Sequence, residues 1–464
     1  MEKPRTVGEL RSSGYKVLTV REEMRKNLIA KIKGKQSLFP GIIGYEDSVV
    51  PAIENALLAG QDVIFLGERV QAKSRIIRAL TSLLDDETPV LAGCEIPEDP
   101  FEPITKTGRD IVAEQGDAAP IAWMPREDRY GEKLATPDIT IADLIGEVDP
   151  IKVAEGRYLS DELTIHYGLI PRTNRGIFCI NELPDLAERI QVGLLNIMEE
   201  RDVQIRGYRI RLPLDVVVVA SAHPEDYTNR GRIITPLKDR YGAQIRTHYP
   251  RNVDHEIDIM ERECWQFPAD DYQVNVPQYM KEIVAEITRL ARRSPDVNQR
   301  SGVSVRASIA DYESLLANAM RRAIRLGESE VVPRITDLPY IIPAISGKIE
   351  LETVEDGRED QIIEKLIQGG VVAVFNRNFN IGELEELVTR FKSGLSLEVS
   401  DHMASQDYVK LAKQSESLDR AVGKVGAAGD PALTAAAVEF ILEGLHLNKR
   451  LNKDRVAGRV QYRG

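Results

Sequence analysis

The sequence is poor in the residue types that mark secreted or zinc-binding proteins. It has three cysteines in 464 residues, and they are too widely spaced for a paired metal-ligand motif: Cys94, Cys179 and Cys264. The six histidines are scattered and give no zinc signature either. Because structural disulfides are rare in reducing compartments, we expect free, mostly buried thiols and a cytoplasmic location.

Long apolar runs and a positive net charge are also missing. The longest apolar run lies near residues 216–220 and is far shorter than the roughly 20 residues that span a bilayer. The first 35 residues carry charges throughout and contain no signal-peptide core. The formal net charge of −12 disfavours bulk attraction to nucleic acid or to an anionic membrane.

What the sequence does contain is the composition of a globular protein, with 42% hydrophobic and 29% charged residues. The chain is too long for one ordinary domain. Between residues 38 and 250, short β-rich runs alternate with helical patterns, which predicts an α/β core with a parallel sheet flanked by helices. The clearest strands are predicted at residues 63–66, 176–180 and 216–220, each nearly all apolar.

The other regions are predicted to be helical. Residues 1–37 are charged and are expected to form a peripheral helical segment. Residues 251–345 repeat apolar side chains at helical spacing, and residues 346–464 are expected to be mostly helical. These patterns predict four parts, with boundaries near residues 37, 250 and 345.

Four shorter segments have patterns of their own. A partly polar insertion occupies residues 136–175, and residues 202–212 alternate apolar side chains about Gly207, which predicts a β-hairpin. The glycine-rich residues 423–429 are expected to form a flexible linker before a helix that starts at Asp430 and Pro431. Beyond Asn448 the chain is basic, as in a solvated terminus.

A phosphate-binding loop is predicted directly after the strand at 63–66. Its residues are Gly67, Glu68, Arg69, Val70, Gln71, Ala72, Lys73 and Ser74. A helical pattern follows at residues 75–80. In such a loop the backbone N–H groups attract phosphates, the lysine reaches the β and γ oxygens, and the hydroxyl holds Mg²⁺. A purely structural turn is the alternative for this segment taken alone.

Polar residues at the ends of two further strands strengthen the nucleotide hypothesis. Asn181 and Glu182 follow the second strand. At this position P-loop ATPases normally carry an acidic pair that orients Mg²⁺ and polarises the attacking water. His223 follows the third strand. Two interpretations of it stay open: it senses the γ-phosphate, or it only caps the end of the strand. Arg240 and Arg306 come later in the chain. Each of these features is a weak signal alone, but their order and spacing after the loop make the whole set specific.

Together these features resemble an AAA+ ATPase and, within that superfamily, the magnesium-chelatase ATPase subunit and the related MoxR-type ATPases. The insertion with residues 142–146, the hairpin at 202–212 and the segment at 38–44 carry this resemblance. It covers roughly residues 38–345, about two-thirds of the chain. It implies a P-loop AAA+ core followed by an α-helical lid at 251–345.

The resemblance also implies roles for individual residues. The phosphate loop would bind ATP, with Ser74 and Asn181 at the Mg²⁺ ion. Glu182 would be the catalytic base, and His223 stands at the sensor-1 position. Arg240 would be the arginine finger, with Arg246 as a less favoured alternative. Arg306 would be the sensor-2 arginine of the lid.

Four positions depart from the family pattern: Val70, Ala72, Asn181 and His223. The first two stand where glycine serves because it accepts a positive φ; alanine costs little if its φ is negative, and valine fits only if its side chain points away. Asparagine at 181 removes a negative charge near Mg²⁺, and histidine at 223 makes the sensor pH-sensitive. We expect nucleotide binding to survive these changes better than fast hydrolysis.

Two classes of function fit the sequence. In the first, a homo-oligomeric ring, expected to be hexameric, hydrolyses ATP slowly and remodels a partner or drives metal or cofactor insertion. Relatives of this type work with a partner that carries a von Willebrand factor A domain; such a partner would be a separate chain here. In the second, ATP only stabilises a scaffold. A transcriptional activator is disfavoured, because the sequence has neither a sigma-factor-gripping loop nor a clear helix-turn-helix.

Overall fold

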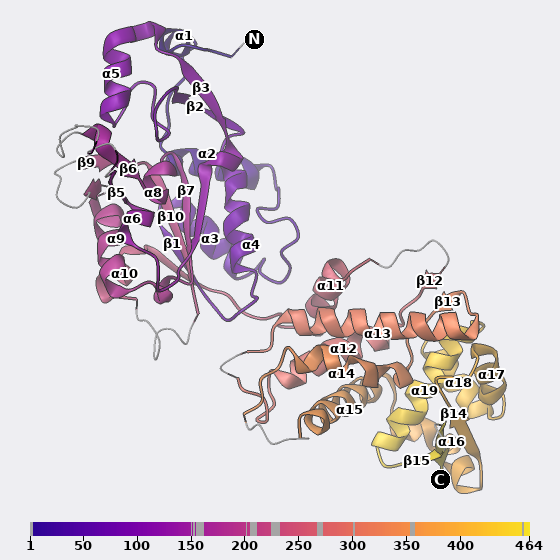
Figure 1. The fold of residues 1–464 in the computed structure, drawn as a ribbon. Helices are drawn as coiled ribbons and strands as arrows, with labels where there is room; N and C mark the ends of the chain where they lie inside the picture. Colours follow the sequence, from indigo (N-terminus) through magenta and orange to yellow (C-terminus); the bar gives the residue numbers. More distant parts are fainter. Residues whose placement is uncertain are drawn as a thin grey trace. The chain divides into compact units, whose positions relative to one another are not determined.

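The chain forms two compact units, Met1–His248 and Tyr249–Gly464, in the computed structural model (Figure 1). The structure describes residues 3–149, 162–200, 202–204, 211–223, 233–266, 272–299, 302–352, 358–456 and 459–464, together with Ile151 and Ala154. No helix in this described part of the chain is long and apolar enough to cross a membrane.

The first unit alternates helices and strands. Its helices are α1 (Val7–Ser12), α2 (Val20–Lys33), α3 (Val49–Leu58), α4 (Lys73–Ala79), α5 (Lys106–Gln115), α6 (Ile141–Leu144), α8 (Leu169–Arg172), α9 (Glu188–Glu200) and α10 (Thr235–Arg240). Its strands are β1 (Val63–Leu66), β2 (Glu87–Leu91), β3 (Ile121–Pro125), β4 (Tyr130–Leu134), β5 (Gly146–Val148), β6 (Ile165–Tyr167), β7 (Gly176–Asn181), β8 (Asp202–Gln204), β9 (Arg211–Pro213), β10 (Val216–Ala222) and β11 (Ala243–Arg246).

A five-stranded sheet in the order β11-β1-β10-β7-β4 is the centre of the first unit, and every neighbouring pair in it is parallel. β1, β7 and β10 are buried along their whole length. Strands that are covered on both faces read as continuous apolar runs, which is why the sequence predicted these three. The predicted α/β core with a parallel sheet is confirmed.

Helices cover both faces of this sheet (Figure 1). Alternate strand residues point to opposite faces. Val63 and Phe65 of β1 pack in one cluster with α2, α3 and α4, while Ile64 and Leu66 pack in another with α6, α9 and α10. The same alternation runs along β7 and β10, so the side chains at the strand ends also have a defined face.

The expectation that residues 1–37 are peripheral is wrong. The segment is helical, but α2 lies in the core of the first unit, where Val20, Met24 and Leu28 are at most 1% exposed. Glu23 of α2 is also buried and forms a two-bonded ion pair with the fully buried Arg129, at 2.7 and 2.6 Å. Hydrophobic residues on one helix face were outweighed in the sequence pattern by the charges around them.

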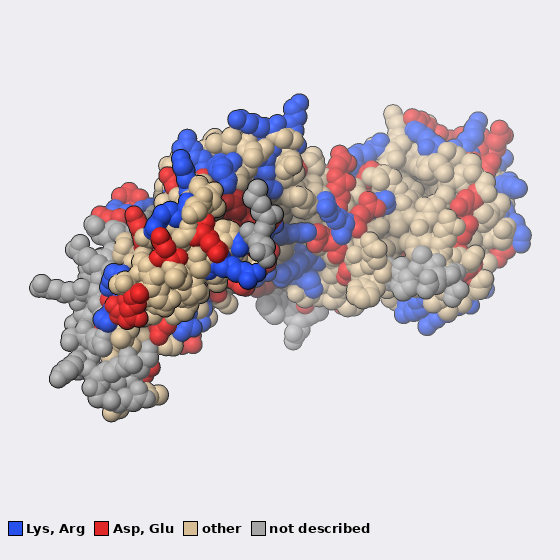
Figure 2. All heavy atoms as spheres, turned by 90° about the horizontal axis from the view of Figure 1, so that it is seen from above, with Lys and Arg blue, Asp and Glu red and all other residues tan. Residues whose placement is uncertain are grey.

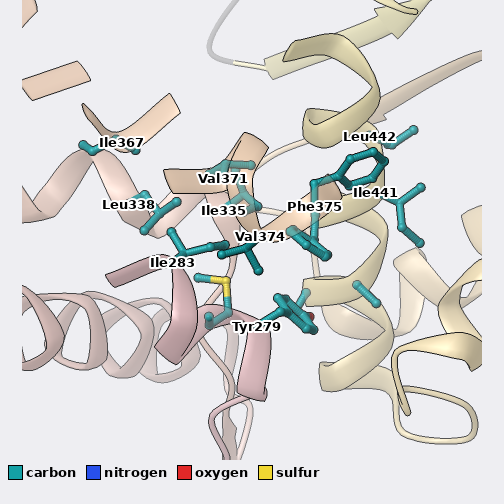
Figure 3. Close-up of a cluster of buried hydrophobic side chains, with 14 of the residues drawn as sticks. Tyr279, Ile283, Ile335, Leu338, Ile367, Val371, Val374, Phe375, Ile441 and Leu442 are labelled. Atoms are coloured by element: carbon teal, nitrogen blue, oxygen red, sulfur yellow. The ribbon is translucent and has the colours of Figure 1, made fainter. Parts of the chain in front are cut away.

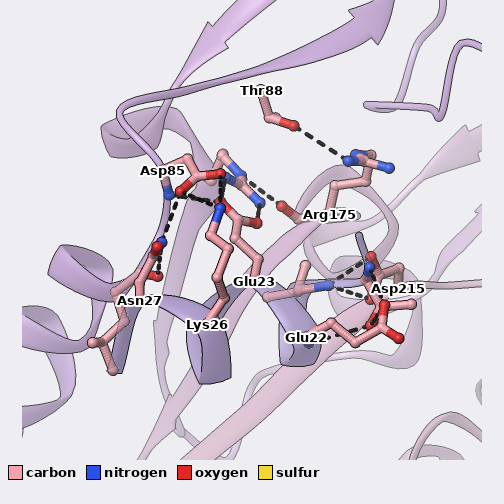
Figure 4. Close-up of polar contacts among 12 residues, drawn as sticks. Glu22, Glu23, Lys26, Asn27, Asp85, Thr88, Arg175 and Asp215 are labelled. Carbon is pink, nitrogen blue, oxygen red and sulfur yellow. Dashed lines mark hydrogen bonds and ion pairs between the residues drawn. The ribbon is translucent and has the colours of Figure 1, made fainter. Parts of the chain in front are cut away.

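The polar contacts of α2 extend along its length (Figure 4). Lys26 pairs with Asp85 at 2.9 Å, and the backbone N–H of Asp85 donates to Glu23 at 2.6 Å. At the start of the helix, the backbone N–H of Val20 donates to both carboxylate oxygens of Asp215, at 3.1 and 3.0 Å. The N-terminal segment is therefore anchored to the loops that surround the sheet.

Both predicted interruptions of the α/β pattern occur in the structure. In the insertion, β5 and β6 pair antiparallel beside α6 and α8. The arms of the predicted hairpin, β8 and β9, also pair antiparallel. Its Ile205, Gly207, Tyr208 and Ile210, like residues 155–161 of the insertion, lie outside the described residues.

The second unit is mainly helical. Its helices are α11 (Val253–Glu263), α12 (Gln278–Ala291), α13 (Val305–Leu326), α14 (Ile342–Ser346), α15 (Arg358–Asn378), α16 (Glu385–Lys392), α17 (Ser405–Ala412), α18 (Glu416–Lys424) and α19 (Pro431–Leu447). Its strands are β12 (Gln273–Val274), β13 (Glu330–Val331), β14 (Ser396–Val399), β15 (Asn452–Val456) and β16 (Arg459–Arg463).

One hydrophobic core runs through this unit, from Ile257 to Tyr462. Figure 3 shows its centre, where Tyr279 and Ile283 of α12 lie beside Val374 and Phe375 of α15. The predicted boundary near residue 345 falls within this continuous core. Side chains from both sides of that position share the core, and they are buried together.

A buried polar network also joins the two sides of residue 345. Arg334 is fully buried and donates to the carbonyl oxygen of Met403 at 2.9 Å and to the hydroxyl of Ser405 at 2.7 Å. Tyr408 donates to the buried Glu439 at 2.5 Å. These bonds satisfy buried polar groups that would otherwise cost folding free energy.

Two predictions for the C-terminal segment need correction. Residues beyond Asn448 are not a solvated terminus, since β15 and β16 form an antiparallel hairpin that pairs with β14. Tyr462 of β16 is 2% exposed and donates to Glu443 of α19. The predicted flexible linker at 423–429 begins inside α18, whose last two residues are 423 and 424, and continues as turns in which Ala427 is buried. The helix start at Asp430 is confirmed by its side-chain cap.

Acidic and basic side chains lie interspersed on the face drawn in Figure 2. The net charge of −12 is thus accompanied by mixed charges there, and not by one broad acidic area.

Candidate nucleotide-binding site

The carboxyl ends of the central strands bring several predicted site residues to one edge of the sheet. Leu66 of β1 is in register with Ala222 of β10, so Gly67 and His223 follow at the same level. Asn181 is the last residue of β7, and Glu182 follows it. In open α/β sheets the crevice at this edge is where ligands bind.

The predicted phosphate loop connects β1 to α4 and has an unusual backbone. Val70 has a φ of 59° and Ala72 a φ of 57°, both in the left-handed region. The condition under which alanine would cost little, a negative φ, is therefore not met. For residues with a Cβ this conformation costs roughly 1–2 kcal/mol each. Such strain persists where the surroundings hold the backbone in place, and it concentrates at functional sites.

Hydrogen bonds among Tyr45, Thr247 and the loop residue Gln71 hold the loop in this shape. The hydroxyl of Tyr45 donates to the carbonyl oxygens of Gln71 at 3.0 Å and of His248 at 2.8 Å. Burial raises the pKa of Tyr45 to about 12, so this donor stays protonated. The hydroxyl of Thr247 donates to the side-chain oxygen of Gln71 at 2.6 Å. A Cβ on Gly67 would collide with both Thr247 and Gln71, so only glycine fits there.

Lys73 lies inside the loop that it would serve. It is the first residue of α4 and is only 6% exposed. Its ammonium group donates to the carbonyl oxygens of Gly67 and, at 2.9 Å, of Glu68. A positive charge is thus held within the loop. Ser74, Arg69 and Arg75 are exposed around it, and Glu68 is half-buried.

The residues at the end of β7 are linked to β10 by a buried hydroxyl. Ser221 is 1% exposed; it donates to Oδ1 of Asn181 at 3.1 Å and accepts the backbone N–H of Glu182, also at 3.1 Å. Glu182 itself has a φ of 53°, a third left-handed residue in the site. The carboxylate of Glu182 is therefore carried by a backbone that two neighbouring strands position.

A carboxylate that the sequence reasoning missed lies next to Asn181. Glu132 of β4 accepts the side-chain N–H of Asn181 and is paired with Arg78 of α4, at 2.8 and 3.1 Å. The hydroxyl of Tyr130 donates to it at 3.1 Å. The hydrogen bond from Arg78 holds the pKa of Glu132 below its usual value. Because β4 is only half-buried and reads as polar, nothing in the sequence marked it as a strand of the sheet.

Signals for the other missed residues are weak but present. Tyr45 directly follows the segment at 38–44 that carried the family resemblance, and Ser221 lies two residues before His223 at the end of β10. Thr247 follows β11, the edge strand that was not predicted. Polar residues at the carboxyl ends of parallel strands are candidate site residues even where they match no motif.

The predicted arginines do not all lie at this edge. Arg240, the last residue of α10, pairs with Glu199 of α9 at 2.7 Å, and this hydrogen bond raises its pKa. Arg246 ends β11 in register with Leu66 and is exposed. Arg306 is an exposed residue near the start of α13, in the second unit. His223 is buried, with 8% of its surface exposed.

The donor set at the edge of the sheet fits a nucleoside triphosphate with Mg²⁺. Lys73 supplies a cation for phosphate oxygens, and the hydroxyl of Ser74 and the amide oxygen of Asn181 are hard oxygen ligands of the kind that Mg²⁺ takes together with phosphates. The side chains of Thr247 and Gln71 pack closely against Gly67 and leave no space for a Cβ there. No part of this set requires a soft metal ligand.

Sequence comparison finds related proteins but no matching family model. A magnesium-chelatase 38 kDa subunit of Rhodobacter capsulatus is 26% identical over 251 residues, which are 53% of this chain and 63% of that protein. The chain thus spans a little under two thirds of that relative. The magnesium-chelatase subunit ChlI of Nostoc sp. is 25% identical over 374 residues, 75% of this chain and 91% of that protein.

A solved structure of the magnesium-chelatase complex between subunits BchI and BchD includes a chain that is 20% identical to this one. The structural match covers 71% of this chain and 98% of the other chain, with a TM-score of 0.36. The two sequence relatives named above are magnesium-chelatase subunits. The MoxR-type part of the resemblance stays a prediction. The sequence of this chain is similar to those of magnesium-chelatase subunits.

Proposed function

We propose that the first unit binds ATP with Mg²⁺ at residues 67–74 and hydrolyses it slowly. The observation that carries this proposal is the position of the buried Lys73 within a strained loop, at the same sheet edge as Asn181, Glu182 and His223. A strained backbone around a buried cation is a costly arrangement that a structural turn does not need.

The residues of the site have separate roles in this proposal. Lys73 binds phosphate oxygens in place of the loop carbonyls, and the backbone of residues 67–72 surrounds the phosphates. Ser74 and Asn181 hold Mg²⁺, which neutralises phosphate charge when bound. The carboxylate of Glu182 orients a water molecule and accepts its proton, and the imidazole of His223 donates a hydrogen bond toward the phosphate.

Slow turnover follows from the residue at position 181. At an effective dielectric constant near 20, a pair of unit charges 4 Å apart interacts by about 4 kcal/mol. Asparagine lacks that charge, but its amide oxygen would still be a neutral oxygen ligand for the ion. We expect a partial loss of catalytic power and little loss of binding.

We also propose that the protein works as a homo-oligomeric ring, expected to be hexameric, in which Arg240 reaches the nucleotide of a neighbouring subunit. For this, Arg240 has to leave Glu199. The pair is accessible, with side chains 31% and 51% exposed, so its separation costs little. In the same proposal residues 251–345 act as a lid that carries Arg306 as sensor 2.

The work done by the ring would be remodelling of a partner or insertion of a metal or cofactor. The relatives are named as magnesium-chelatase subunits, and one solved complex contains two such subunits. We propose a separate partner, of the type with a von Willebrand factor A domain. The insertion around α6 and the hairpin of β8 and β9 are the surfaces proposed to contact it.

A nucleotide-switched scaffold without turnover is the second candidate. The left-handed Val70 and Ala72 and the uncharged Asn181 favour it. Glu182→Gln distinguishes the two functions. If the protein is an ATPase, this variant binds ATP with near wild-type affinity but retains it unhydrolysed. Equal turnover in the wild type and in this variant would contradict hydrolysis at this site and leave the scaffold.

A further inference from the structure

The negative charge closest to Asn181 is on the neighbouring strand. Asn181 is 8% exposed, and the alternation along β7 places its side chain on the face of the sheet that α4 covers. Glu132 of β4 is in register with Cys179, two residues before Asn181, and shares that face. The side chain of Asn181 reaches across to Glu132 and donates its amide N–H to the carboxylate.

This contact determines which way the amide of Asn181 points. An ionised carboxylate only accepts hydrogen bonds, so the atom of Asn181 that faces Glu132 has to be the nitrogen. The amide oxygen then faces the opposite way, where it accepts the hydroxyl of Ser221 at 3.1 Å. The thiol of Cys179 is the second donor to this oxygen, with Sγ 3.5 Å from Oδ1. Because a thiol is a weak donor, the proposed Mg²⁺ site would take over this second lone pair of the amide oxygen.

Glu132 is in turn held by residues on both sides. Arg78 of α4 donates to it twice, and Tyr130 once. Arg78 lies five positions after Lys73 on the helix that begins at the phosphate loop. A continuous chain of hydrogen bonds therefore leads from α4 through Glu132, Asn181 and Ser221 to the backbone N–H of Glu182.

We propose that Glu132 is a positioning residue that aims the amide oxygen of Asn181 at the Mg²⁺ site, and that positions 132 and 181 require one carboxylate and one amide. This inference rests on the proposed function. Two carboxylates would repel each other, and one would be protonated or turned away. Two amides would leave the Asn181 orientation weakly determined, because either end of the second amide could face it.

The requirement for one carboxylate and one amide at positions 132 and 181 explains why Asn181 can stand where an acidic residue is expected. The site keeps its carboxylate, but it lies on β4 and acts through Asn181. Residues behind a metal ligand commonly change metal affinity by about 10-fold to 100-fold when they are replaced. Glu132 is therefore expected to affect the metal-dependent part of nucleotide binding.

The test compares ATP affinity in excess Mg²⁺ with ATP affinity in EDTA, by calorimetry on the full chain. The Mg²⁺-to-EDTA affinity ratio is measured for the wild type, Glu132→Gln, Asn181→Asp and the double variant Glu132→Gln/Asn181→Asp. We expect each single variant to lower the ratio about tenfold or more. The double variant, which restores one carboxylate and one amide in swapped order, should return to within about threefold of the wild type.

A merely structural role gives a different pattern. It would lower the melting temperature and shift ATP affinity equally with and without Mg²⁺, leaving the ratio unchanged. Glu162→Gln is the matched control, because Glu162 is another partly buried carboxylate; it pairs with Arg109 at 3.0 Å and contacts Lys106, both on α5. Its ratio should equal that of the wild type.

Either of two results would overturn the inference. One is a wild-type ratio in Glu132→Gln, and the other is an unchanged or increased ratio in Asn181→Asp. These results differ from a failure of the proposed function, in which the wild type itself binds no ATP in either condition.

Discussion

The ammonium group of Lys73 lies 2.9 Å from the carbonyl oxygen of Glu68, five residues earlier in the same loop. The lysine thus occupies the interior of the loop, where phosphates are proposed to bind. Phosphate oxygens would replace loop carbonyls as its acceptors, and these charge-assisted bonds are stronger than those to neutral carbonyls. The loop has the shape for this exchange even though two of its left-handed residues are not glycine.

Glycine at either strained position should relieve the loop. We expect Val70→Gly and Ala72→Gly to leave stability unchanged or raise it by about 1 kcal/mol, because the left-handed backbone no longer meets a Cβ. Ala79→Gly is the control, since Ala79 has a φ of −67° at the end of α4, the helix that follows the loop, and should lose about 1 kcal/mol. Urea unfolding measures all three. A loss at positions 70 and 72 equal to that at 79 would contradict the strained loop.

The ring proposal predicts rescue between two inactive variants. Arg240→Ala should lose ATP turnover but little stability, because its pair with Glu199 is accessible. Mixed with Lys73→Ala, it should regain activity. In a random one-to-one ring about a quarter of the interfaces would combine an intact loop with an intact Arg240. Steady-state ATP hydrolysis across mixing ratios measures this, and a flat, inactive series would argue against the finger in trans.

Helix α2 should be essential to the stability of the first unit. Glu23→Gln breaks its buried pair with Arg129 and should cost about 3–5 kcal/mol of unfolding free energy. Glu22→Gln changes the exposed neighbour in the capping box of α2 and should cost about 1 kcal/mol or less. Chemical denaturation compares the two variants. Similar small losses in both would mean that α2 is peripheral after all.

Asp311 should make the second unit less stable as the pH rises. It is fully buried, and neither carboxylate oxygen has a hydrogen-bond partner among the described residues. Burial raises its pKa well above the ordinary 3.8. The folded state therefore holds this proton more tightly than the unfolded state, and stability falls as the pH rises from 3.8 through the raised pKa.

Asp311→Asn removes this titration. The variant should gain stability relative to the wild type at pH 8, and less at pH 5, in melting experiments. The difference between the two proteins isolates the effect from that of all other titrating groups. A difference that is the same at both pH values would show that Asp311 does not change its proton binding on folding.

Much of the first unit was predictable because its chemistry is local. The apolar runs of β1, β7 and β10 follow from burial on both faces, and the loop residues follow directly after β1. The residues that follow these three strands therefore lie at one edge of the sheet, and their roles in a site stay predictions. The α/β class follows from the same alternation of strands and helices.

What could not be predicted depends on pairing between distant segments. Glu132 belongs to the site only because β4 pairs with β7, and a half-buried edge strand has no distinctive pattern. The basic C-terminal residues form β15 and β16 only because β14 provides a partner. The φ angles of Val70 and Ala72 are set by the surrounding contacts, against the preference of both residues.

Equilibrium binding of ATP in the presence of Mg²⁺ to the wild type and to Lys73→Ala tests the central claim most directly. Isothermal titration calorimetry should find binding to the wild type and an affinity about 100-fold lower for the variant, equivalent to about 2.7 kcal/mol. The melting temperature of each protein shows whether both are folded. Equal affinity of two folded proteins, or no binding to the wild type, would contradict a nucleotide site at residues 67–74.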